Sequence, residues 1–61
     1  MAAYFVKVNY WYDRRSDIHY NGECIITYEK FERVDEESFR KKVKDKFTTA
    51  EVIKITDIVK L

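Results

Sequence analysis

Few residues in this chain of 61 have the chemistry that catalysis needs. The single histidine, His19, and the single cysteine, Cys24, are of the types that form a base and a nucleophile. They are five positions apart in a strand-like stretch, and this odd spacing places their side chains on opposite faces of a strand. We therefore expect Cys24 to be a small core residue and His19 to lie on a sheet surface, stacked on Trp11. No catalytic residues are assigned, and the chain is predicted not to be an enzyme.

Metal and cofactor sites are also not expected. One cysteine and one histidine do not make a zinc site, and one cysteine makes no disulfide within the chain. Gly22 is the only glycine, whereas a phosphate-cradling loop needs several. Adjacent carboxylates occur at Glu36 and Glu37, at a solvated helix start. The free thiol is typical of a reducing cytoplasm, which is the location we expect.

The basic residues suggest one binding activity. The stretch "RKKVKDK", residues 40–46, has a charge of +4, and Arg14 and Arg15 lie in a predicted loop. Weak, salt-sensitive binding to nucleic acid through Arg14, Arg15, Lys41 and Lys44 is therefore an alternative function. The adjoining stretch 29–37 has a charge of −3 and the whole chain only +1, so these lysines are also explained as a solvated helix face.

Two strand-like stretches, 2–12 and 18–34, flank a polar loop from Asp13 to Asp17. An antiparallel register that places Val6 opposite Cys24 puts apolar, aromatic or glycine residues together on one face. On the other face it places an opposite-charge pair, an amide pair and an apolar pair across from one another. The competing interpretation is that Asn21-Gly22 forms a tight turn and divides the second stretch into a separate hairpin.

A helix is predicted over 36–47. Asp35 is a suitable N-cap, acidic residues follow it, and basic residues lie in the last turn. Phe39, Val43 and Phe47 recur at helical spacing and form one narrow apolar stripe. The tail, 51–61, is predicted to be a third strand whose odd positions form one apolar face, interrupted by Asp57.

These elements give a single α+β domain, residues 1–61, in the order β-β-α-β. A right-handed crossover places the last strand beside the first, so we expect a three-stranded antiparallel sheet of order 2-1-3. One helix should pack on one face of it, against the even positions of the hairpin. The predicted core comprises Val6, Val8, Tyr10, Cys24, Ile26, Tyr28, Phe39, Val43, Phe47, Ile53 and Ile55.

The second face of this sheet then has no helix to cover it. It would expose Phe5, Trp11 and Ile25 beside His19, with Phe31 as a further candidate, and such patches commonly mark interfaces. We expect a small binding module that forms homodimers, binds a larger protein, or does both, without a membrane. Small accessory and inhibitor proteins of phages and mobile elements have a similar size and composition.

Overall fold

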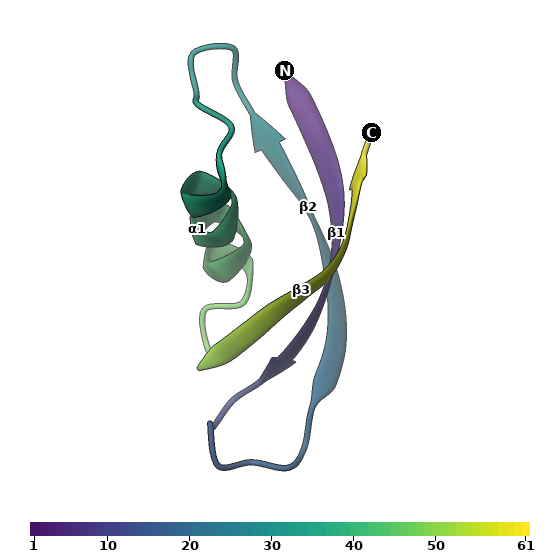
Figure 1. Ribbon diagram of the computed structural model, residues 1–61, viewed down its shortest axis with the longest axis vertical. Coiled ribbons are helices and arrows are strands. Elements are labelled where there is room, and N and C mark those ends of the chain that lie inside the picture. Colours follow the sequence, from purple (N-terminus) through teal and green to yellow (C-terminus); the bar gives the residue numbers. More distant parts are fainter.

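The structure is a computed structural model that describes residues 1–61. Its elements are β1 (Ala2–Trp11), β2 (Tyr20–Tyr28), α1 (Glu36–Lys46) and β3 (Val52–Lys60). The strands form one antiparallel sheet in the order β2-β1-β3, and the helix lies on one side of it (Figure 1). The predicted α+β fold is therefore confirmed, including the strand order. The helix is too short and too polar to span a membrane.

The predicted register between β1 and β2 is confirmed, with Val6 opposite Cys24 and Lys7 opposite Glu23. The interpretation of Asn21-Gly22 as a tight turn is wrong, because both residues lie inside β2. Gly22 is required there by packing, not by its backbone angles. A Cβ atom at Gly22 would lie only 2.8 Å from Phe47 Cε1 and 2.9 Å from Tyr10 Cε1.

Both strands of the hairpin are shorter than predicted. β1 ends at Trp11, and residues 12–19 form the connection. Side chains in this loop bind the local backbone in place of a strand ladder: Arg15 N donates to Asp13 Oδ1 at 2.9 Å, and Ile18 N donates to Ser16 Oγ at 3.1 Å. β2 ends at Tyr28 and not near residue 34, because the backbone turns where Glu32 N donates to Glu29 O at 3.1 Å.

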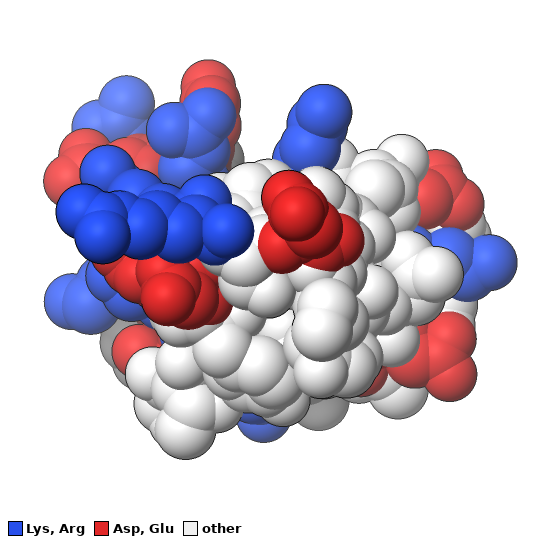
Figure 2. Space-filling view, turned by 90° about the horizontal axis from the view of Figure 1, so that it is seen from below, with Lys and Arg blue, Asp and Glu red and all other residues white.

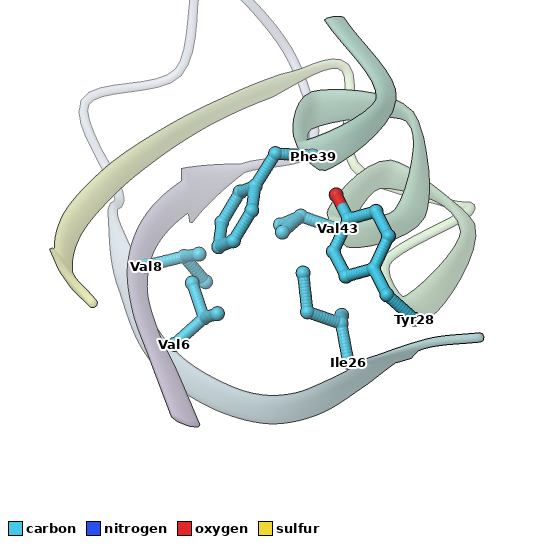
Figure 3. Packing of buried hydrophobic residues seen from close by; sticks show 6 residues of the cluster. All are labelled: Val6, Val8, Ile26, Tyr28, Phe39 and Val43. Carbon is cyan, nitrogen blue, oxygen red and sulfur yellow. The ribbon is translucent and has the colours of Figure 1, made fainter. Parts of the chain in front are cut away.

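The core lies between the helix and the first two strands (Figure 3). Val6 and Val8 come from β1, and two further core residues come from each of β2 and α1. All of them point toward one another, and the most buried are 0–1 % exposed. The remaining predicted core residues are partly buried around this cluster. The buried residues are Val6, Val8, Ile26, Tyr28, Phe39, Val43 and Ala50.

The helix begins at Glu36, as predicted, and ends at Lys46, one residue before the predicted end. Ser38 N donates to Asp35 Oδ1 at 2.8 Å, and Asp35 N donates to Ser38 Oγ at 3.2 Å, a reciprocal capping box. Phe47 is the C-cap, and its ring packs 5.0 Å from that of Tyr10. At the helix start, Ser38 Oγ also lies 3.1 Å from Tyr28 OH of β2. Both ends of the helix therefore contact the hairpin, and the helix packs more against β2 than against β3.

β3 differs from the prediction at its centre. Its pairing with β1 shifts between Lys7 and Val8, so that Lys7 lies opposite Asp57 but Val8 lies opposite Ile55. Thr56 is the extra residue of this bulge, and its Oγ1 donates to Lys7 O at 3.1 Å. The predicted single face of odd residues is therefore wrong: Ile53 and Ile55 face the helix side, whereas Asp57 and Val59 face the other.

Candidate functional site

The face of the sheet opposite the helix, here called the open face, has no other element over it (Figure 1). Since Val6 and Val8 point to the helix, the alternate residues of β1 point the other way. Their cross-strand partners complete the surface. The open face comprises Ala3, Phe5, Lys7, Asn9, Trp11, Asn21, Glu23, Ile25, Thr27, Val52, Lys54, Asp57 and Val59, together with His19, which stacks on Trp11.

One end of the open face is an apolar cluster centred on Phe5. In the sheet register, Phe5 lies between Ile25 of β2 and Val59 of β3. Its ring is half-buried, whereas Ile25 is 52 % and Val59 48 % exposed. The two aliphatic side chains therefore present the accessible apolar surface. Phe5 and Ile25 were predicted here from the sequence, but Val59 was not, because the bulge at Thr56 places it on this face.

The other end of the open face is an aromatic pair. The rings of Trp11 and His19 are stacked as predicted, with centroids 4.2 Å apart and planes only 9° from parallel. Val52 lies beside Trp11 in the sheet register. His19 is exposed and Trp11 is half-buried. This end of the open face therefore presents flat aromatic surface together with the polar nitrogen atoms of the His19 ring.

Charged and amide side chains separate the two apolar ends. Lys7 lies between Glu23 and Asp57, and Asn9 Nδ2 donates to Asn21 Oδ1 at 3.2 Å. Lys54 lies on the other side of Asn9. The open face thus carries two cations and two anions in alternation, with no net field that would attract a polyanion.

The helix side also has an accessible surface, a groove between α1 and β3. It is open, about 1240 Å³ in volume, and lined mainly by apolar residues. Phe39 and Val43 form the helix wall, and Ile53, Ile55 and Ile58 line the strand side. Ile58 is 47 % exposed. The groove exists because the helix packs over the hairpin and leaves β3 partly uncovered.

The basic residues do not form one continuous patch of positive charge. Arg14 binds Glu51 through Nε at 3.3 Å, and its backbone N donates to the same carboxylate at 3.3 Å. Arg15, Lys41 and Lys44 are exposed, the first in the hairpin loop and the others on α1. Figure 2, which views the hairpin-loop end, shows acidic side chains interspersed among the basic ones around an uncharged surface.

Two further lysine and arginine side chains of the helix are also paired with acids. Arg40 Nη2 lies 2.7 Å from Glu36 Oε1. Lys42 Nζ lies 2.9 Å from Glu32 Oε2 and 4.7 Å from the centre of the Tyr28 ring, so its ammonium group lies over a core aromatic ring. The pKa of Glu32 is lowered first by the hydrogen bond that the Glu29 backbone N donates to its carboxylate at 2.9 Å, and then by the hydrogen bond from Lys42.

The two residues considered for catalysis are on different sides of the sheet. His19 stacks on Trp11 on the open face, whereas Cys24 packs against the core on the helix side. Burial raises the pKa of the Cys24 thiol, and Lys46 offsets part of that effect. Such a thiol is a poor nucleophile near neutral pH. No group of three or more histidine, cysteine, aspartate or glutamate side chains is arranged to hold a metal ion.

Comparison with known proteins gives no relative for this chain: no protein-family model, curated protein or solved structure matches it.

Proposed function

We propose that this protein is a non-enzymatic binding module that contacts another protein through its open face. The observation that supports this most strongly is the apolar cluster of Phe5, Ile25 and Val59. Large apolar side chains lie there on three neighbouring strands, with no element of the chain over them. Buried between two proteins, such a cluster would supply the centre of an interface.

The middle of the open face favours a protein as the partner. Cations and anions alternate there, at Lys7, Glu23, Lys54 and Asp57. A partner with the complementary pattern would be oriented by these charges, and partners with like charges would be rejected. The stacked Trp11 and His19 offer a second anchor at the far end, because tryptophan is enriched among the residues that dominate binding energy.

Weak nucleic-acid binding through Arg14, Arg15, Lys41 and Lys44 has less support. Phosphate binding needs cations free to replace counterions, and Arg14 is bound to Glu51. The other three lie in two elements, with acidic side chains among them. An accessory or inhibitor role of the phage type and a cytoplasmic location are finer predictions that rest on size and composition.

A quantitative pull-down tests the proposal with matched variants. Immobilised protein is exposed to a lysate of the source cells, and each retained protein is quantified for wild type, Ile25→Glu, Trp11→Ala and Phe31→Glu. Phe31 is the control, because it is 88 % exposed and lies in the turn after β2, outside the strands that form the open face. We expect a retained protein that Ile25→Glu and Trp11→Ala lose and Phe31→Glu keeps.

The circular-dichroism spectra of all the variants should match that of the wild type, which shows that lost capture is not lost folding. A protein retained equally by Ile25→Glu and Phe31→Glu would contradict binding through the open face. Capture of labelled DNA or RNA, lost on raising the salt and on changing Arg15 or Lys41 but not Ile25, would instead support the nucleic-acid alternative.

A further inference from the structure

β3 is an edge strand, with β1 on one side and no strand on the other. Its backbone groups on that side have no partner strand within the chain, and its side chains are largely exposed from Thr56 to Lys60. Natural proteins protect such edges with charges, proline or a covering element, since an open edge is a template for another strand. β3 has no proline and no cover, and its charges do not simply block pairing.

The charges of β3 complement those of a second copy of the same strand. In an antiparallel pair, residues directly opposite each other point to the same face. When β3 is placed beside its own copy with Lys54 opposite the partner's Asp57, two ion pairs form on the open face, related by symmetry. The same register places Val52 opposite the partner's Val59 and Ile53 opposite the partner's Ile58.

The bulge at Thr56 makes this register possible. In a regular strand, Lys54 and Asp57 would point to opposite faces, because they are an odd number of residues apart. The extra residue reverses the alternation, so that both lie on the open face, opposite Asn9 and Lys7 of β1. It likewise brings Ile53 and Ile58 to the same face, where both line the groove beside α1.

Neighbouring registers match less well. Sliding one copy by two residues in one direction places Lys54 opposite the partner's Val59 and Ile53 opposite the partner's Lys60. Sliding it the other way places Val52 opposite the partner's Asp57. Each shift buries a charge against an aliphatic side chain and loses both ion pairs, so the first register is selected.

The other edge strand offers no comparable match. The only charged residue within β2 is Glu23, and no cation lies on the same strand to receive it. We therefore propose that β3 pairs antiparallel with β3 of a second copy, in the register that joins Lys54 to the partner's Asp57. The product is a six-stranded sheet with both helices on one side, both open faces on the other, and the Ile58 side chains covered.

Sedimentation equilibrium at low salt, over roughly a hundredfold range of protein concentration, tests this proposal. Wild type should form a dimer, whereas Lys54→Asp and Asp57→Lys should each be monomeric, because each places like charges opposite one another twice. An equimolar mixture of the two variants should recover a dimer, since opposite charges then face each other at both positions, one pair as in the wild type and one reversed. Lys41→Asp, an exposed charge reversal on α1, is the control and should behave as wild type.

The mixing experiment distinguishes a disrupted dimer interface from a loss of folding, because a variant that cannot fold does not form a dimer when it is mixed with the other variant. A wild-type chain that stays monomeric throughout would overturn the proposal, as would a dimer that both charge reversals leave intact. A dimer abolished by Ile25→Glu but insensitive to Lys54→Asp would overturn it too, and would place self-association on the open face. The pull-down from lysate is a separate test, so either result leaves the proposed binding function to be judged independently.

Discussion

Ile25 and Ile26 are adjacent in β2 and show how differently the two faces of the sheet are used. Ile26 is 1 % exposed beneath the helix, and Ile25 is 52 % exposed on the open face. The sequence supplies large apolar residues to both faces, but only one face has a layer of structure over it. The covered face therefore stabilises the fold, and the open face is available for association.

The sharpest test of this comparison replaces each isoleucine by alanine. Ile26→Ala should lower the free energy of unfolding by about 2–5 kcal/mol, because it removes buried methyl groups and leaves a cavity. Ile25→Ala should cost less than about 1 kcal/mol, as at other exposed positions. Urea denaturation at low protein concentration measures both. Equal losses would mean that the open face is covered in solution.

A second test concerns the close packing at Gly22 on the covered face. Gly22→Ala should destabilise the protein by roughly 1–3 kcal/mol, because its new Cβ would overlap the rings of Phe47 and Tyr10. In a Phe47→Leu background the same change should cost clearly less, which a double-mutant cycle measures. If the cost is the same in both backgrounds, ring packing is not the reason for glycine at this position.

The helix cap gives a smaller effect that depends on pH. The hydrogen bond from the Ser38 backbone lowers the pKa of Asp35 in the folded chain. The charged carboxylate therefore stabilises the fold above its unfolded-state pKa, about 3.9, and this contribution is lost as the pH falls through the lower folded-state pKa. Asp35→Asn should keep the cap but lose that part of the pH dependence in acid unfolding, whereas Asp35→Ala should lose both.

The smallest expected effect is on the rate at which the Cys24 thiol reacts. Because burial raises the pKa of its thiol, Cys24 should react with a disulfide reagent several-fold more slowly in the folded chain than in denaturant. The comparison is Thr27→Cys in a Cys24→Ala background, which places a thiol on the open face of the same strand. Equal rates for the two folded thiols would show that the helix side gives no protection.

Local sequence patterns predicted those parts of the fold that depend on neighbouring residues. The alternation of apolar and polar residues along β1 and β2 predicted their register, since a shift of one residue would expose Val6 and bury Lys7. Asp35 and the charges after it predicted the start of the helix. The open face followed from the same alternation, because only one helix was available to cover one side.

The bulge at Thr56 was not predictable in this way. The odd positions of the last strand read as a plausible apolar face, and only Asp57 conflicted with it. Which side of β3 faces the helix depends on its pairing with β1, a contact between residues far apart in the sequence. Val59 and Ile58 were therefore assigned to the wrong faces, and the charge match across the β3 edge could not be foreseen.

The open face as the site of contact with another protein is tested most directly by photo-crosslinking in the source cells. A photoreactive amino acid is placed at position 25 on the open face and, in a separate chain, at position 31 in the exposed turn. We expect a discrete adduct with a second protein from position 25 and none from position 31. No adduct from position 25, or the same adducts from both positions, would contradict it.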